Sequence, residues 1–279
     1  MDEALFAIHR RNNEATRNAN NTFSAHRRRL TSLLVQTPGG RLAVLGAGNG
    51  NDLDWNVLLA AFEEVHVFDI DEEATSYLLD ALPKSATPVV AHAPVDLTGT
   101  ASRYAAWQAR RISPEELTLV ATDAIEAVAS DIGETYDVVV STCLLSQLMH
   151  GARIALGAQH ADLRALAVCL QLGHLRLLSR LLNRHGRAIL VSDVASNDDL
   201  DLRPVVSSET AAQAMAMLTA NGRCFTGTDP LQSLRMLETD EVLATQVDAQ
   251  LPLNAWVWQM SAVRSYLVAA LTFARKTLT

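Results

Sequence analysis

Short apolar segments alternate with segments of helical periodicity along most of this 279-residue chain. Apolar runs of strand length occupy residues 41–47, 64–70, 87–95, 136–141 and 187–194. Helical patterns separate them at 52–62, at 72–82, after the capping residue Ser113, and over 161–185, where Gly186 is expected to end the helix. Strands that are apolar throughout and alternate with helices indicate a mostly parallel sheet, with both faces covered by helices.

The two ends of the chain extend this pattern. Residues 207–220 and 230–238 suit helices, and "AWVWQM" and "RSYLVAALTF" suit a closing pair of strands. Residues 1–38 are expected to form an N-terminal helical extension with Leu30, Leu33 and Leu34 facing a core. Its asparagine-rich stretch is poor in helix formers, so we predict that residues 9–29 form a lid rather than a continuous helix. Residues 39–279 then form the main domain.

Composition excludes several classes of protein. The net charge is −8 and no lysine-rich tract is present, which argues against nucleic acid or an anionic membrane as partner. Cys143, Cys169 and Cys224 are far apart in sequence, so neither a disulfide framework nor a zinc site is indicated, and we expect no bound metal. No run reaches the roughly 18 apolar residues that span a bilayer. These features predict a cytoplasmic protein.

The stretch "LAVLGAGNGNDLDW", residues 42–55, marks the expected ligand site. Gly46, Gly48 and Gly50 follow the first strand, where ligands of parallel sheets bind. Asp69 ends the second strand, 23 residues after Gly46, at the separation expected of a carboxylate that accepts hydrogen bonds from ribose hydroxyls. The glycine turn and the acid together predict a nucleoside-containing ligand.

The spacing of the turn argues against a dinucleotide. A dinucleotide fingerprint reads G-x-G-x-x-G, whereas this turn reads G-x-G-x-G and has Asn at position 51. Asp52 would stand where a pyrophosphate normally binds, and two negative charges there repel each other. S-adenosyl-L-methionine carries a ribose and two cationic groups but no phosphate, so it suits the turn better.

At these motifs the chain resembles the class I, Rossmann-like, S-adenosylmethionine-dependent methyltransferases. The resemblance rests on "VLGAGNGNDLD", "VHVFDID", "PVDLTG" and "YDVVVSTCLLSQL", in the order the family has them, and it covers about residues 40–270. It departs from the family at Leu45, where an acidic residue is common. It implies a seven-stranded α/β sheet with the last strand antiparallel.

The resemblance also implies roles for individual residues. Gly46, Gly48, Gly50 and Asp52 would lie against the methionine part of the cofactor, Asp69 would bind ribose and Ile70 would pack on adenine. Asp96 and Leu97 would contact adenine, although "ATDAIEAV" offers Asp123 as an alternative to Asp96. The capping box at Ser113 favours a helix near Asp123, so we prefer Asp96. Ser141 and Thr142 would lie beside the reactive methyl group.

The methyl acceptor and any general base are expected after the fourth and fifth strands. His150 is the first candidate base because histidine titrates near neutral pH, and His160 and Asp193 are further catalytic candidates. Ser146, Gln147 and Arg153 are candidate substrate-binding residues. The loop "STCL" lacks the Asn/Asp-Pro-Pro-aromatic motif of DNA base methylation.

These features predict transfer of a methyl group to an oxygen or nitrogen of a small metabolite or a peptide side chain. The alternatives are an NAD(P)-dependent oxidoreductase, which the glycine spacing disfavours, and a non-catalytic cofactor-binding module.

Overall fold

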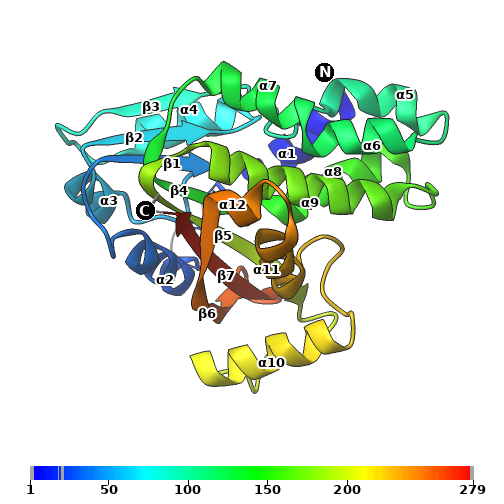
Figure 1. Cartoon of the computed structure of the whole chain (residues 1–279). Helices are drawn as coiled ribbons and strands as arrows, with labels where there is room; N and C mark the ends of the chain where they lie inside the picture. Colours follow the sequence, from blue (N-terminus) through cyan, green and yellow to red (C-terminus); the bar gives the residue numbers. More distant parts are fainter. Residues whose placement is uncertain (1–2, 18, 20–21, 277–279) are drawn as a thin grey trace.

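A seven-stranded sheet forms the centre of the computed structural model, which describes residues 3–17, 19 and 22–276 (Figure 1). The strand order is β3-β2-β1-β4-β5-β7-β6. Strands β1 to β5 pair in parallel, and β7 is antiparallel to both β5 and β6. The bounds are β1 Arg41–Leu45, β2 Glu64–Phe68, β3 Val89–His92, β4 Tyr136–Thr142, β5 Leu182–Ser196, β6 Val247–Gln259 and β7 Ser265–Arg275. The predicted Rossmann-like sheet with an antiparallel last strand is confirmed.

Side-chain alternation along β1 shows how the two faces of the sheet are covered. Leu42 and Val44 belong to one apolar cluster, and Ala43 and Leu45 belong to another, as period-two geometry requires. The first cluster includes side chains of α2 Ser24–Leu34, α3 Trp55–Ala61 and α4 Glu72–Ala81. The second is covered by α5 Tyr104–Gln108, α6 Pro114–Ala121, α7 Asp123–Ile132, α8 Leu144–Leu156 and α9 Leu163–Arg180, together with α11 Pro230–Thr239 and α12 Leu243–Gln246.

Two smaller elements complete the fold. The 3-10 helix η1, Ala101–Arg103, precedes α5, and α10, Ser208–Ala220, packs on β6 and β7 through a third apolar cluster. The capping box at Ser113 is present, with Glu116 as its reciprocal partner.

The N-terminal segment is more helical than its composition predicts. Helix α1 runs from Glu3 to Thr16, through part of the asparagine-rich stretch, and α2 begins only at Ser24, so the expected break is present but begins after Thr16. Its position explains the difference, because asparagine side chains of the glycine turn bond its last-turn carbonyls. Leu30, Leu33 and Leu34 of α2 are buried in the same cluster as β1 and β2, as expected.

The expected helix over 161–185 ends earlier than predicted. Helix α9 stops at Arg180 and β5 begins at Leu182, so Gly186 lies inside a strand and does not end a helix. The pairing of β4 with β5 shifts register between Tyr136 and Val138, and an added Cβ at Gly186 would lie 2.8 Å from the Tyr136 carbonyl oxygen. Glycine is therefore needed there for close strand approach.

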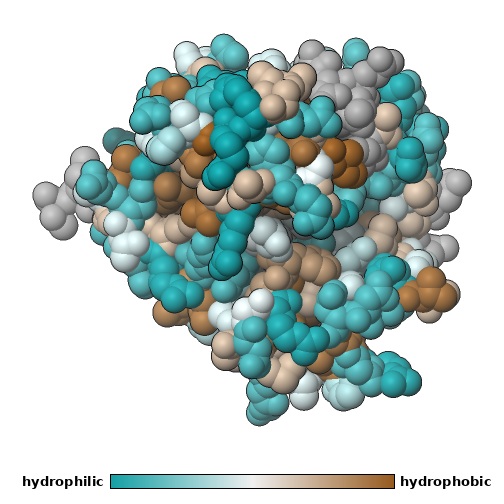
Figure 2. All heavy atoms as spheres, turned by 90° about the vertical axis from the view of Figure 1, so that its right-hand side faces the viewer, coloured by the Kyte–Doolittle hydropathy of each residue, from teal (hydrophilic) through white to brown (hydrophobic). Residues whose placement is uncertain are grey.

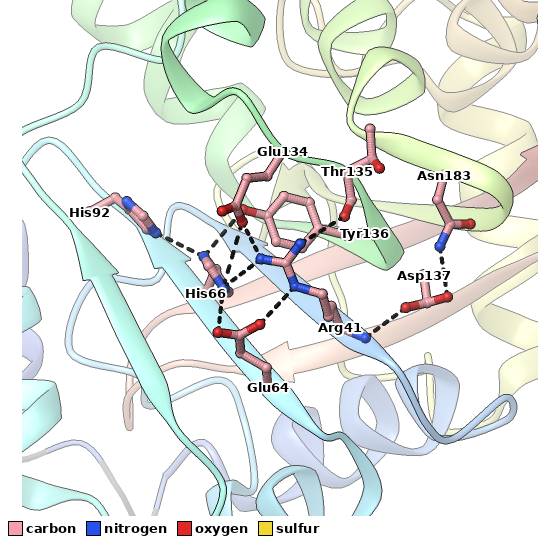
Figure 3. Close-up of polar contacts among 9 residues, drawn as sticks. All are labelled: Arg41, Glu64, His66, His92, Glu134, Thr135, Tyr136, Asp137 and Asn183. Atoms are coloured by element: carbon pink, nitrogen blue, oxygen red, sulfur yellow. Dashed lines mark hydrogen bonds and ion pairs between the residues drawn. The ribbon is translucent and has the colours of Figure 1, made fainter.

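A polar network ties the starts of β1, β2 and β4 together (Figure 3). Arg41 donates to Glu64 at 2.7 Å and also contacts Glu134, while His66 lies 2.9 Å from His92. This network lies at the amino ends of the parallel strands, away from the edge where ligands of such sheets bind.

No helix among the described residues is long and apolar enough to cross a membrane. Figure 2 shows one face of the molecule, on which hydrophilic side chains surround small, separate hydrophobic groups.

Candidate functional site

Two adjoining cavities lie at the carboxyl ends of β1, β2, β4 and β5. The first has a volume of about 50 Å³ and the second about 670 Å³. The two cavities share five lining residues, which are His9, Asn13, Gly46, Gly48 and Gln147. The shared lining makes them two parts of one site.

Asp69 is the buried acid of the first cavity. Its Oδ2 accepts a hydrogen bond from the Gly48 N–H at 2.7 Å, and its Oδ1 accepts one from the Asp71 N–H at 2.9 Å. Burial raises the pKa of Asp69, and these two backbone donors oppose the rise. A carboxylate has about four acceptor positions, so two remain for a pair of ribose hydroxyls. Asp69 thus fits a ribose, and Ile70 lines the same cavity.

The three glycines of the turn have different roles. Gly46 and Gly48 have φ of +75° and +48° and line both cavities. Gly50 lines neither. An added Cβ there would lie 2.4 Å from Leu78 Cδ1 and 2.6 Å from Trp55 Nε1, so close packing requires glycine at this position.

Of the two candidate adenine contacts, the position in the structure favours Asp96 over Asp123. Asp96 and Leu97 line the first cavity, and the Asp96 carboxylate is fixed by the N–H groups of Thr98 and Ala101. Asp123 is exposed at the start of α7, on a helix and not at the end of a strand, and lines neither cavity.

Helix α1 lies directly over the glycine turn. Asn49 Nδ2 donates to the Asn13 carbonyl at 2.6 Å, and Asn51 Nδ2 donates to the Thr16 carbonyl at 2.7 Å. Asn13 Nδ2 donates in turn to Asp71 Oδ2 at 2.8 Å. These bonds hold α1 across the first cavity and explain its small volume.

The second cavity has an acid at its base on β5. Asp193 is 8% exposed and its Oδ1 accepts a hydrogen bond from the Ser146 hydroxyl at 2.6 Å. Burial raises the pKa of Asp193 to about 6, and the Ser146 bond opposes the rise. Burial, and then the charge of Asp193, raise the pKa of the neighbouring Cys143 thiol, so this cysteine stays neutral.

Asp52 is the second acid of this cavity. Burial raises its pKa to about 7, Arg27 opposes the rise and Asp193 adds to it. His26 Nε2 lies 3.6 Å from Asp52 Oδ1. Burial lowers the pKa of His26 to about 3, so the ring is neutral at pH 7. Trp256 donates to His26 Nδ1, which leaves the ring proton on Nε2, facing Asp52.

The remaining predicted residues are divided between the cavity and the core. Gln147, His150 and Arg153 of α8 line the second cavity. Burial, followed by the Arg153 charge, lowers the pKa of His150. His160 lines neither cavity, because its Nε2 faces the carbonyls of Trp107 and Arg110 at 3.0 Å in a surface loop. The structure therefore does not bring His160, a predicted catalytic residue, to either cavity.

Ser141 and Thr142 also separate. Thr142 lines the second cavity and donates to the Gly46 carbonyl at 2.7 Å, which joins the end of β4 to the glycine turn. Ser141, predicted to lie beside the methyl group, has no exposed surface, lines neither cavity and lies 2.8 Å from His174 Nε2 of α9.

Sequence reasoning missed the aromatic side of the second cavity. Phe23, Phe225, Trp258 and Tyr266 line it, and they come from the residue before α2, a loop and the two C-terminal strands. The alternation of "AWVWQM" places Trp256 and Trp258 on one face, but no local pattern shows that this face meets the glycine turn. Among the described residues, no group of three or more His, Cys, Asp or Glu side chains could hold a metal ion.

Searches against protein-family models and curated proteins find no match for this chain. Solved structures do match. Magnesium protoporphyrin IX methyltransferase from Synechocystis PCC 6803, with bound SAH, is 13% identical at a TM-score of 0.44, over 92% of this chain and 83% of that one. N-methyltransferase NodS from Bradyrhizobium japonicum WM9, in complex with S-adenosyl-L-homocysteine, is 13% identical at 0.45, over 90% and 87%.

A SAM-dependent methyltransferase from Methanosarcina mazei is 10% identical at a TM-score of 0.47, over 89% of this chain and 97% of that chain. These identities and scores are too low to assign an activity. The function is therefore inferred from the sheet order and the site of the chain itself.

Proposed function

We propose that this protein is an S-adenosyl-L-methionine-dependent methyltransferase that methylates an oxygen or nitrogen of a small metabolite or a peptide side chain. The observation that carries the proposal is Asp69. It is a buried carboxylate at the end of β2 with two unused acceptor positions, and it shares a cavity with Gly46 and Gly48. The cavity beside it is of the size that binds metabolites.

The site suits this cofactor better than a dinucleotide. Helix α3 begins beyond the glycine turn at Trp55, and the Asp54 side chain caps it by accepting from the Val57 N–H. Asp52 lies two residues earlier. A pyrophosphate at this helix start would meet both carboxylates, whereas the ammonium and sulfonium of S-adenosylmethionine carry charge of the opposite sign.

Each part of the site has a separate task in this proposal. Asp69 holds the ribose, Ile70 and Leu97 pack on the adenine, and the turn at Gly46 and Gly48 accommodates the methionine part. When bound, the cofactor supplies a methyl carbon on a cationic sulfur. The protein aligns the acceptor in the second cavity and keeps water out, which is most of what such a displacement requires.

Asp193 and His150 are the groups of the second cavity suited to receive a proton from the acceptor. Asp193 is buried and bonded to Ser146, whereas His150 is exposed on α8. The cavity is too small for a folded macromolecule. Together with the net charge of −8, its size favours a metabolite or a single side chain over nucleic acid.

The proposal is tested by incubating the protein with methyl-labelled S-adenosylmethionine and a cell extract separated by size into metabolite, peptide and nucleic-acid fractions. Labelled product is expected in the metabolite or peptide fraction. Label found only in nucleic acid would contradict the acceptor class, and absence of cofactor binding would contradict the reaction.

A further inference from the structure

An aromatic wall bounds one side of the second cavity. Phe23 and Trp258 meet edge to face at 4.9 Å, Trp258 and Tyr266 lie 5.6 Å apart, and Tyr266 and Phe225 lie 6.4 Å apart. All four residues line the cavity. The Trp258 ring is also stacked by His26 at 4.5 Å, so it contributes mainly apolar surface. Aromatic rings attract cations as well as apolar groups.

The two buried acids line the same cavity as this wall. Asp52 Oδ1 lies 3.6 Å from His26 Nε2, and the His26 ring stacks on Trp258 at 4.5 Å. Burial, followed by the charge of Asp193, raises the pKa of Tyr266. Asp193 also adds to the raised pKa of Asp52. The cavity therefore combines aromatic faces with two carboxylates that lie near each other.

Several buried polar atoms at the cavity have no hydrogen-bond partner. Asp52 Oδ1 and Asn49 Oδ1 are acceptors of this kind, and the His26 Nε2 that faces Asp52 Oδ1 at 3.6 Å is likewise unpaired. The Asn49 side chain is oriented by its Nδ2, which donates to the Asn13 carbonyl, so Oδ1 is the side-chain atom without a partner. Trp258 Nε1 is a buried donor without an acceptor. Buried polar groups are normally satisfied, so the two oxygens call for a donor from a ligand or water.

Among the described residues, no positively charged group forms an ion pair with Asp193, so its carboxylate can bind a cationic ligand. Arg27 acts on Asp52, and His26 is neutral. Arg153 lines the cavity from the exposed part of α8, where solvent screens its charge. His9 and His150 line the cavity from α1 and α8, and the lowered pKa of His150 favours its neutral form. The hydrogen-bond partner of Asp193 is the neutral hydroxyl of Ser146.

We propose that the methyl acceptor is an amine with an apolar or aromatic body, whose nitrogen binds between Asp193, Asp52 and the ring of Tyr266. This inference rests on the proposed methyltransferase function and narrows its acceptor to nitrogen. An ammonium group has three donors and no acceptor, which matches the unpaired Asp52 and Asn49 oxygens. The methylated product stays cationic and keeps its attraction to the Tyr266 ring.

The reaction at this site balances in one proton transfer and one displacement. The ammonium gives a proton to the carboxylate of Asp193 and becomes a neutral amine. The nitrogen lone pair then forms the N–C bond as the C–S bond breaks, with that bond pair left on a neutral thioether. Desolvation raises the pKa of a carboxyl group and lowers that of an ammonium. Burial therefore reduces the difference between the two pKa values and makes the proton transfer easier.

The test measures binding, not turnover, with three ligands of nearly equal shape. Phenethylamine, 2-phenylethanol and phenylacetate are titrated into the full-length protein saturated with S-adenosylhomocysteine, by calorimetry and by quenching of tryptophan fluorescence. The amine is expected to bind at least tenfold more tightly than the alcohol, and phenylacetate to bind least. Equal binding of amine and alcohol, tighter binding of phenylacetate, or no measurable binding of the amine would overturn the inference.

Variants locate the binding group. Asp193→Asn is expected to reduce the preference for amine over alcohol at least fivefold while S-adenosylhomocysteine affinity stays within twofold. Asp52→Asn should reduce the same preference, and it should also weaken S-adenosylhomocysteine binding, because Asp52 faces the cofactor's ammonium in the proposed function. Asp131→Asn removes an exposed carboxylate on α7 and should leave the preference unchanged. A preference that survives in both cavity variants would place the amine elsewhere. If a variant does not fold, the three-ligand series on the unaltered protein still decides.

Failure of the proposed function gives a different result. In that case S-adenosylhomocysteine does not bind at all, and the amine loses its assignment as a methyl acceptor. If S-adenosylhomocysteine binds and only the amine preference is missing, the function stands and the amine inference alone is wrong.

Discussion

Replacing Asp69 by Asn tests the nucleoside part of the site most sharply. The two side chains have the same shape, but Asn carries no charge, and its NH₂ group must face one of the two backbone N–H donors that now bond to the carboxylate, those of Gly48 and Asp71. The variant should therefore lose affinity for S-adenosylhomocysteine, whose ribose would use the same two oxygens.

The expected magnitude follows from the bonds at stake. A hydrogen bond to a charged group contributes about 1.5–3 kcal/mol, and about 1.4 kcal/mol corresponds to a tenfold change in affinity. Losing one such bond to ribose raises the dissociation constant at least tenfold, and losing two raises it to roughly a hundredfold or more. Since the exchange removes a costly buried charge, the fold should survive.

Isothermal titration calorimetry with S-adenosylhomocysteine measures the effect directly. Asp123→Asn is the matched control, because it makes the same chemical change at an exposed carboxylate on α7. It should leave the dissociation constant within twofold. An unchanged dissociation constant in Asp69→Asn, in a protein with unchanged circular dichroism, would refute a ribose at Asp69.

Three further predictions concern the lid, the turn and pH. Trypsin cleavage after Arg10 or Arg17 of the N-terminal segment should slow when S-adenosylhomocysteine and an acceptor are bound; equal rates with and without them would make the segment a connector only. Gly50→Ala should lower the free energy of unfolding in urea by about 1–3 kcal/mol, because its φ is +71° and the new methyl group overlaps its neighbours; an unchanged midpoint would contradict this packing. Asp193 has a pKa of about 6 in the fold against 3.8 as its ordinary value, so its burial costs stability above pH 6 and costs nothing below pH 4. Asp193→Asn should then gain roughly 3 kcal/mol over the unaltered protein at pH 8 and lose that gain toward pH 4, and a gain independent of pH would show that this carboxyl has an ordinary pKa.

Much of the sheet could be predicted because the signals are local. Each parallel strand is a short apolar run, and Ser113 and Glu116 form the capping box that their spacing predicts. Asp69 and the first two glycines also follow from position, since the loops after neighbouring parallel strands meet at one edge of the sheet.

The rest of the site depends on contacts between distant segments. Gly50 looks like a ligand glycine in sequence, yet Leu78 and Trp55 occupy the space beside it. Helix α1 persists through poor helix formers because Asn49 and Asn51, some 35 residues away, bond its carbonyls. The aromatic wall is assembled from the residue before α2, a loop residue and the last two strands, and His160 contacts carbonyls of another segment.

The central claim is that the turn and Asp69 bind S-adenosylmethionine and not a nicotinamide dinucleotide. Calorimetric titration of the full-length protein with S-adenosylmethionine, S-adenosylhomocysteine, NADH and NADPH tests it in one series. We expect binding of the first two at a one-to-one ratio and no heat of binding from either dinucleotide. Tight binding of NADH or NADPH, with no response to S-adenosylmethionine, would contradict the account.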